Sequence, residues 1–223
     1  LASETTAGLW VPLVPPLNAL LARLESLSLE PGLAAQRQIA LRLALQPYLE
    51  SGRGALLSPL PQETELGNLL LYADFYPQDG QLTLIEQLRD VITEHIPQEE
   101  REWLDPLKHS YLDLAEFLSV DEQDQRLVFR SIGDARVYRV PDGVFRKGLQ
   151  SGQILLTRLV REPGDVEWER AVIAGAAIVL SNEDGKGLLN ATLDYRRQVE
   201  ISAGSFELGE WPEFAKRYGH VLL

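Results

Sequence analysis

The fold is decided by the stretch RLVFRSIGDARVYRVPDGVFRKGLQSGQILLTRLVR, residues 126–161. Strand-forming residues alternate here with turn residues: two β-rich runs flank Gly133-Asp134, and a third apolar run follows Gly152. Nowhere else in the chain do strand and turn signals alternate as cleanly. We therefore expect an antiparallel sheet that grows outward from this segment.

A two-residue loop at Gly133-Asp134 would fix the register of the first hairpin. The predicted cross-strand pairs are Ile132 with Ala135, Arg130 with Val137, Phe129 with Tyr138, and Val128 with Arg139. Side chains alternate between the two faces of a strand. The core side should therefore take Leu127, Phe129, Tyr138 and Val140. Arg130 and Arg139 should lie on the other side.

Two further strands are predicted at about 153–160 and about 168–180, the second with a break at Gly175. The run ILLTRLV, residues 154–160, has no polar face. A strand that is apolar on both faces favours closure of the sheet into a barrel, or cover by helices, over an open sheet.

Leucine-rich segments before residue 120 predict a helical region of about five helices. Prolines keep residues 1–16 extended. Apolar stripes at helical spacing follow, the first formed by Leu17, Leu20, Leu21, Leu24 and Leu27, and the third by Leu66, Leu69, Leu70 and Ala73. A second helix is expected at about 33–45. Thr83 and Glu86 fit a capping box for a helix at about 84–95. A further helix begins near Pro97, with Trp103, Leu104 and Leu107 as its buried residues.

The segment SYLDLAEFLSV, residues 110–120, is compatible with another helix or with the first strand. After residue 182 a helix is expected with an inner stripe of Leu188, Ala191, Thr192 and Tyr195, followed by a short helix at 212–218 anchored by Phe214. The predicted fold class is α+β in three parts: a helical region at 1–120, a small antiparallel β module at 121–181 with barrel-like closure as an option, and a helical tail at 182–223 packed back on one of them.

Composition narrows the chemistry. The 223 residues are 45% hydrophobic and 24% charged, which suits a folded domain with a sizeable core. Cysteine is absent, so disulfides, thiolate catalysis and Cys-ligated zinc or iron-sulfur clusters are excluded. Apolar runs fall far short of the roughly 20 residues that cross a bilayer. The first residues lack the basic and apolar regions of a signal peptide. We therefore expect a cytoplasmic protein that does not bind membranes.

The net charge of -12 is unevenly distributed. Residues 1–120 contain 7 Lys and Arg against 17 Asp and Glu. Residues 126–161 contain 2 acidic residues against 8 basic ones: Arg126, Arg130, Arg136, Arg139, Arg146, Lys147, Arg158 and Arg161. These eight side chains are the candidate anion-binding or partner-binding residues. They either pair with acidic residues of the same chain or meet an anionic partner, and the first interpretation is favoured.

Catalytic and metal-binding patterns do not emerge from the sequence. His95, His109 and His220 lack the spacing of a helical metal pair. The carboxylates Glu99, Glu100, Glu102 and Asp105 are typical of a solvated first helical turn. Glycine pairs at 143–148 and 185–187 lack the spacing of a phosphate-binding loop. We predict no catalytic residue, no metal ligand and no cofactor.

Four short motifs carry a resemblance: Tyr72-Ala73-Asp74-Phe75, Leu82-Thr83-Leu84-Ile85-Glu86, Glu99-Glu100-Arg101, and SGQILLTRLV at 151–160. In this order, across about half of the chain, they resemble a poorly characterised family of bacterial proteins with a helical region and a small β module. Some members of that family carry a SecA-like zinc-binding tail (the SEC-C motif). The cysteines of that tail are absent here, so the resemblance implies no zinc site, and it implies no activity.

Two functions remain in view. The absence of catalytic patterns and the acidic helical surface favour a non-enzymatic interaction or adaptor protein that binds another protein. The alternative is a nucleic-acid-associated protein that uses the arginines of residues 126–161, because phosphates require cations and bases stack on aromatic side chains such as Phe145. The acidic net charge opposes the alternative. The sequence does not indicate an oligomeric state.

Overall fold

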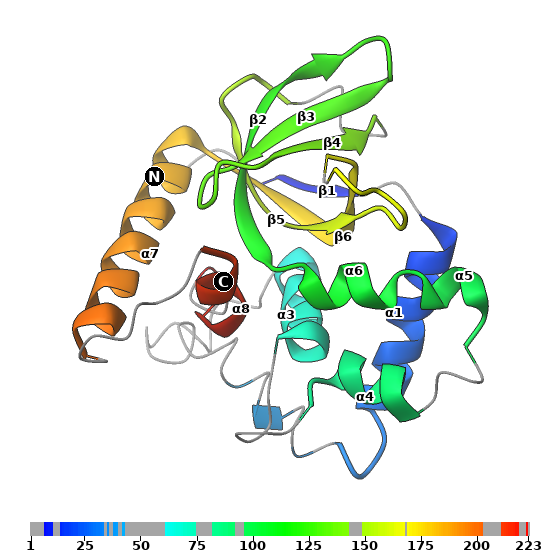
Figure 1. Cartoon of the computed structure of the whole chain (residues 1–223). Coiled ribbons are helices and arrows are strands. Elements are labelled where there is room, and N and C mark those ends of the chain that lie inside the picture. The colour runs from blue at the N-terminus through cyan, green and yellow to red at the C-terminus, as the bar shows by residue number, and fades with distance from the viewer. Residues whose placement is uncertain are drawn as a thin grey trace.

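A computed structural model describes residues 7–10, 14–33, 35, 38–39, 42, 61–74, 82–91, 96–142, 149–167, 169–202, 211–218 and 222. Its centre is a six-stranded antiparallel sheet with the strand order β1-β6-β5-β2-β3-β4 (Figure 1). The strands are β1 (Ala7–Trp10), β2 (Leu112–Asp121), β3 (Arg126–Ser131), β4 (Val137–Pro141), β5 (Ile154–Arg161) and β6 (Ala171–Leu180).

Helices surround the sheet unevenly. The described helices are α1 (Pro15–Ser28), α3 (Pro61–Ala73), α4 (Leu84–Val91), α5 (Gln98–Arg101), α6 (Leu104–His109), α7 (Asn182–Ser202) and α8 (Trp211–Tyr218). The first five lie together beneath one face of the sheet, and α8 lies between α7 and α3 (Figure 1). α7 lies at the left of this view, with Leu188 and Leu189 packed against the same helix-facing core. None of the helices in the described ranges is long and apolar enough to cross a membrane.

The predicted hairpin register is confirmed. β3 and β4 pair Phe129 with Tyr138, Val128 with Arg139, and Arg130 with Val137. The four predicted core residues of the hairpin are buried: Leu127, Phe129, Tyr138 and Val140. The turn is longer than two residues, since β3 ends at Ser131 and β4 begins at Val137. Ala135 takes a positive φ of 61° within this turn.

Two apolar cores share the sheet. The helix-facing core joins α1, α3, α4 and α6 to residues such as Leu114, Leu156 and Ile178. The second core lies on the opposite, concave face, where Phe117, Phe129 and Leu159 pack together. β5 is therefore buried on both faces, which explains why its sequence has no polar face.

A bulge in β6 bends the sheet between these cores. Arg158 of β5 pairs with Ala174 of β6, and Thr157 pairs with Ala177. Two residues of β6, Gly175 and Ala176, therefore have no paired residue on β5. Gly175 has a φ of 72°, and a Cβ there would lie 2.8 Å from Leu69 Cδ1. Glycine is required because the backbone is left-handed and α3 approaches closely. The predicted break at Gly175 is this bulge.

The predicted helical stripes of α1 and α3 are confirmed. Leu17, Leu20 and Leu24 of α1 are buried, as are the four stripe residues of α3: Leu66, Leu69, Leu70 and Ala73. The capping box is present: the Thr83 amide donates to Glu86 Oε2 (2.9 Å). The segment predicted to begin near Pro97 forms two short helices, α5 and α6, with Trp103, Leu104 and Leu107 buried as predicted. Most of the helix predicted at 33–45 lies outside the described residues.

The predicted fold class is wrong in its details. The sheet is not closed: its strand order ends at β1 and β4, and in the described residues β4 forms no ladder with β6. Arg139 of β4 forms an isolated bridge with Arg170 and an ion pair with Glu169. The second face of β5 is covered by the curled sheet itself, through residues of β2, β3, β4 and β6. The tail is also not a packed helical layer, because only the short helix α8 docks with a buried face. Most of α7 is exposed, including Ala191, which was predicted to face inward.

The undecided segment 110–120 is a strand. β2 runs through Leu112–Asp121 at the centre of the sheet, between β5 and β3. The predicted boundary at residues 120 and 121 therefore falls at the end of β2 rather than ahead of the sheet. β1 adds an edge strand from residues 7–10, which the sequence predicted as extended but without a partner.

Candidate functional site

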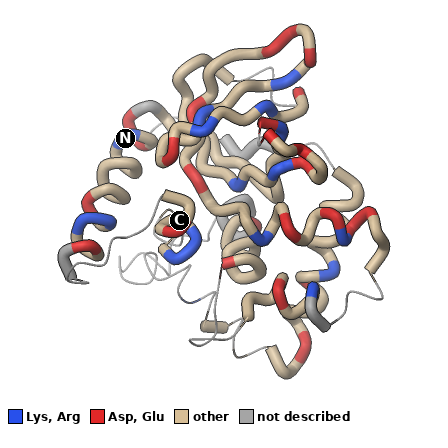
Figure 2. Tube along the Cα trace, in the orientation of Figure 1, with Lys and Arg blue, Asp and Glu red and all other residues tan. Residues whose placement is uncertain are grey.

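Three of the candidate arginines form ion pairs across the outer surface of the sheet. Arg126 binds Glu162 (2.9 Å between Nη1 and Oε1), Arg130 binds Glu116 (2.5 Å), and Arg139 binds Glu169 (2.5 Å). Figure 2 shows basic and acidic residues interspersed over the strands rather than gathered in one basic patch. Each of these cations therefore has a carboxylate at contact distance.

The other candidates are placed differently. Arg136 Nε lies 3.3 Å from Asp134 Oδ2. Burial acts to lower the pKa of Arg136, but Asp134, Tyr138 and Tyr111 together outweigh it, so the pKa is raised. Arg161 is half-buried at the end of β5. Arg146 and Lys147 lie outside the described residues. The structure thus does not bring the described arginines together as one cationic surface.

Arg158 is not a surface residue. Its side chain is 0% exposed, and its Nη2 binds Asp74 Oδ2, which is 3% exposed at the end of α3. Its Nη1 donates to the Ser110 carbonyl (3.3 Å) and to Ser110 Oγ (3.2 Å). A buried guanidinium needs such partners because an unpaired charge is very costly in an apolar core. Arg158 thus ties β5 to the ends of α3 and α6.

Lys216 of α8 enters the same cluster. Its Nζ donates to Asp74 Oδ1 (3.0 Å) and to the backbone carbonyls of Ala73 (3.3 Å), Ser110 (3.2 Å) and Lys108. Burial lowers the pKa of Lys216, and Arg158 adds to the lowering, whereas Asp74 opposes it. One carboxylate and three carbonyls of the body therefore surround this ammonium group.

Asp113 forms a second buried polar group beneath α8. It is 2% exposed, and its Oδ1 accepts from Trp211 Nε1 (3.0 Å) and from the Leu114 amide (2.9 Å). Burial raises the pKa of Asp113 to about 7 despite these donors and Ser131. Nearby, Tyr111 donates its hydroxyl to Asp134 Oδ2 (2.7 Å), and burial raises the pKa of Tyr111.

Aromatic packing completes the contact between α8 and the body. Trp211 and Phe214 are buried against Tyr111, and their ring centroids are 5.5 Å apart. The indole covers Gly133 so closely that a Cβ there would lie 1.9 Å from Trp211 Cε2. Tyr218 meets Tyr195 of α7 edge to face at 5.9 Å. Together, Lys216, Trp211, Phe214 and the groups that they contact form what we call the α8 site.

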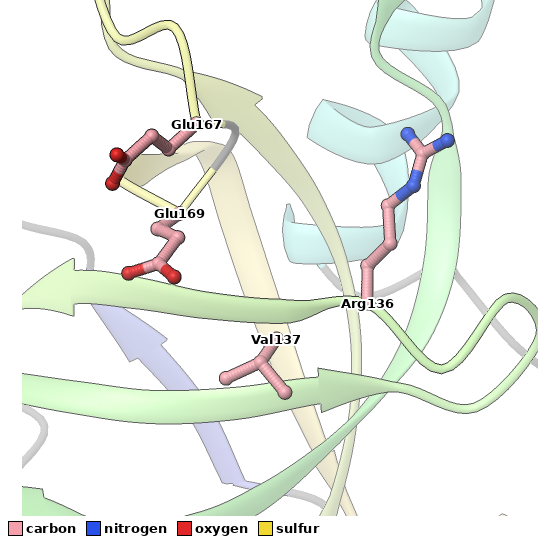
Figure 3. A pocket seen from close by; sticks show the side chains of 4 residues that line it. All are labelled: Arg136, Val137, Glu167 and Glu169. Atoms are coloured by element: carbon pink, nitrogen blue, oxygen red, sulfur yellow. The ribbon is translucent and has the colours of Figure 1, made fainter.

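A separate surface hollow marks the gap where the sheet fails to close. It has a volume of about 370 Å³ and is lined by Arg136, Val137, Glu167 and Glu169. In Figure 3 the two glutamates come from the segment before β6 and hang above β4, while Arg136 extends away from them. Val137 is 40% exposed at this edge. The hollow therefore borders an open strand edge with carboxylates on one side.

Metal binding finds no support in the described part of the chain, where no group of three or more His, Asp or Glu side chains could hold an ion. His109 lies at the end of α6, with its Nδ1 2.8 Å from the Asp105 carbonyl. His95 and His220 lie outside the described residues. The predicted carboxylate helix is not wholly solvated, since Glu100 is 7% exposed and pairs with Arg23 (3.1 Å).

The α8 site was not anticipated from the sequence, although two signals pointed toward it. Arg158 interrupts the apolar run ILLTRLV, and a charge inside a strand buried on both faces must find an internal partner. Trp211 and Phe214 follow the spacing i and i+3, which places them on one face of a helix that needs an apolar partner. Neither signal names the partner.

No protein-family model, no curated protein sequence and no solved structure matches the chain. Its function must therefore be inferred from the geometry described above.

Proposed function

We propose that this chain is a non-enzymatic, cytoplasmic protein-interaction module that binds an extended segment of another protein along the open edge of β4. The observation that carries the proposal is the hollow beside Val137, where no further strand pairs with β4 in the part of the chain that the structure describes. An exposed strand edge offers backbone donors and acceptors to a peptide, which can add to the sheet as another strand.

The backbone geometry supports this edge as the contact. The Ser131 amide donates to the Arg136 carbonyl, so the polar groups of Arg136 face β3. Because these groups alternate in direction along an antiparallel strand, those of Val137 and Arg139 face away from β3. The Arg139 amide donates to the Glu169 carbonyl (2.6 Å), and β4 makes no ladder on that side within the described ranges. Val137 is left at the hollow.

Charge indicates the chemistry of the bound segment. Glu167 and Glu169 stand on the far side of the hollow, whereas Arg136 is held by Asp134. A strand that carries basic side chains on one face would place them near these glutamates. Ion pairing of Arg126, Arg130 and Arg139 leaves less free positive charge for phosphates, which supports a protein partner over nucleic acid.

The test selects short peptides from a random display library against the full chain and measures their affinity for two matched variants. Val137→Pro removes the outward amide and Val137→Thr retains it. We expect basic, extended peptides whose affinity falls at least about tenfold, or 1.4 kcal/mol, in the proline variant and little in the threonine variant. Glu167→Gln should weaken the same peptides.

Two outcomes would overturn the proposal. One is a failure to enrich any peptide, or equal binding by the proline and threonine variants. The other is salt-sensitive binding of single-stranded RNA or DNA that is lost in the Arg130→Ala/Arg139→Ala variant, which would favour the nucleic-acid alternative.

A further inference from the structure

Two helix C-termini converge on the Lys216 ammonium group. Ala73 is the last residue of α3, and Lys108 and Ser110 lie at the end of α6. The final carbonyls of a helix have no partner within the helix and carry its partial negative charge. Lys216 Nζ donates to all three carbonyls. A cation-binding site is therefore built into the body, and α8 fills it.

The site suits a primary ammonium better than a guanidinium. Its oxygens surround a single nitrogen from several directions: Asp74 Oδ1 at 3.0 Å, Ser110 O at 3.2 Å and Ala73 O at 3.3 Å, together with Lys108 O. A lysine head group is a compact charge with three donors, whereas arginine presents a planar fork. The planar position beside Asp74 is already taken by Arg158.

The body also recognises the aromatic side of α8. Asp113 of β2 accepts from Trp211 Nε1, and Gly133 of the β3–β4 turn leaves room for the indole ring. Phe214 packs beside Trp211, with Tyr111 in the same apolar cluster. The α8 site thus contacts the side chains of a Trp, a Phe and a Lys at positions i, i+3 and i+5 of one short helix.

Exchange of α8 is physically accessible because an eight-residue helix has little stability of its own. Its order depends on the groups that it contacts, and these belong to α3, α6, β2, the β3–β4 turn and α7. Local opening of such an element breaks these contacts and leaves the core folded. A longer helix with the same three anchors would incur less of the cost of ordering on binding.

We propose that α8 is an exchangeable intramolecular ligand, and that the α8 site binds a lysine-bearing helix of a partner protein with the pattern Trp-x-x-Phe-x-Lys in its place. The tethered α8 competes at high effective concentration, so the site is closed until a stronger helix displaces it. This inference concerns a surface separate from the edge of β4 and does not depend on binding there.

The experiment measures binding of a fluorescein-labelled peptide with the sequence of residues 209–220 to the full chain. Wild type should bind it weakly because α8 competes. The Trp211→Ala/Lys216→Ala variant, whose own α8 docks poorly, should bind it at least about tenfold more tightly. A peptide with norleucine in place of the lysine should lose that gain. Equal binding by wild type and variant, or by both peptides, would overturn the proposal.

A second measurement covers the case in which the double variant does not fold. In full-length Lys216→Met, ammonium chloride should raise the melting temperature relative to tetramethylammonium chloride at equal ionic strength, because only the small cation fits among the oxygens. Wild type should show no such difference. The absence of any difference in the variant would contradict a built ammonium site.

Two controls separate this proposal from its neighbours. Val137→Pro should leave peptide binding unchanged, so failure of the β4 proposal and failure of this one are distinguishable. A concentration-dependent wild-type dimer that disappears in Lys216→Met would instead identify the occupant as α8 of a second copy and overturn the assignment to a partner protein.

Discussion

An arginine of β3 and an arginine of β5 each form an ion pair with a carboxylate, but the two pairs differ in their exposure to water. Arg130 of β3 meets Glu116 at the sheet surface, where their side chains are 49% and 27% exposed. Arg158 of β5 meets Asp74 with exposed fractions of 0% and 3%. Water competes for the first pair and screens it, so that pair contributes little to stability. The second pair is enclosed, and loss of one partner would leave a buried charge.

The two pairs also differ in what they connect. The surface pair joins adjacent strands that already share backbone hydrogen bonds. The buried pair joins residues 84 positions apart and shares Asp74 with Lys216 of α8. The enclosed cluster therefore connects three separate parts of the chain, whereas the surface pair connects the two strands of one hairpin.

The largest expected effect tests the enclosed cluster directly. Asp74→Ala should lower the free energy of unfolding by about 3–5 kcal/mol, because Arg158 and Lys216 would remain as unpaired buried cations. Urea denaturation followed by circular dichroism measures the loss. The matched control replaces all three groups, as Asp74→Leu/Arg158→Met/Lys216→Met, and should recover much of the stability. A loss below about 1 kcal/mol in the single variant would place this cluster with the surface pairs.

The next effect concerns pH. The Asp113 carboxyl has a raised pKa of about 7 in the folded chain, against an ordinary value of 3.8. Between these values the folded state binds a proton that the unfolded state has released. Stability from this group is therefore full below the ordinary value and is lost as the pH rises through 7, by at most about 1.4 kcal/mol per pH unit.

The Asp113→Asn variant isolates this contribution. Its free energy of unfolding should change less than that of wild type between about pH 5 and about pH 8, and urea titrations at both values measure the difference. Carboxylates with a lowered pKa, such as Glu86 beside the Thr83 amide and Lys108, act in the opposite direction in both proteins. Asp124→Asn in the exposed β2–β3 turn is the control and should follow wild type. Parallel curves for wild type and Asp113→Asn would contradict the assignment.

A smaller effect is expected where α8 meets the β3–β4 turn. Gly133→Ala places a Cβ 1.9 Å from the Trp211 ring, so the indole must shift. The cost should be about 1–3 kcal/mol of stability, with faster amide hydrogen exchange confined to α8. Gly187→Ala on α7 meets nothing within 4 Å and should stabilise by about 0.5–1 kcal/mol. Unchanged exchange in α8 of the Gly133 variant would argue against close docking there.

The smallest effect belongs to the surface pair. Arg130→Ala should cost about 0.2–1 kcal/mol, and less at high salt, because solvent already screens this contact with Glu116. Thermal melting at low and high ionic strength measures it, with Arg197→Ala on exposed α7 as a reference of similar size. A salt-independent loss above about 2 kcal/mol would show that surface and enclosed arginines do not differ as described.

Local signals predicted the β3–β4 hairpin well. Its register follows from a turn at Gly133-Asp134 and from alternation, both of which depend on neighbouring residues. The helical stripe of α1 and the capping box at Thr83 have the same local origin. The segment 110–120 stayed undecided because its apolar residues fit both periods until neighbouring strands are known.

Long-range contacts could not be predicted in the same way. Arg158 was grouped with the surface arginines because it is close to them in sequence, yet the β bulge and α3 enclose it. Asp74 and Lys216, its neighbours in space, lie in distant segments, and one sequence contains no signal that pairs them. Closure of the sheet depends on its curvature and on helix packing. The local sequence therefore could not distinguish a closed barrel from a sheet with an open edge.

The bulge in β6 has a consequence for how the strand tolerates changes in length. Two residues, Gly175 and Ala176, are extra relative to β5. Because side chains repeat every second residue, an even insertion keeps every later position on its original side, so Ala174 and Ile178 both reach the helix-facing core. Deletion of both residues would straighten β6 and leave each later side chain on its present face of the sheet. Deletion of either one alone would move every later side chain of β6 to the opposite face.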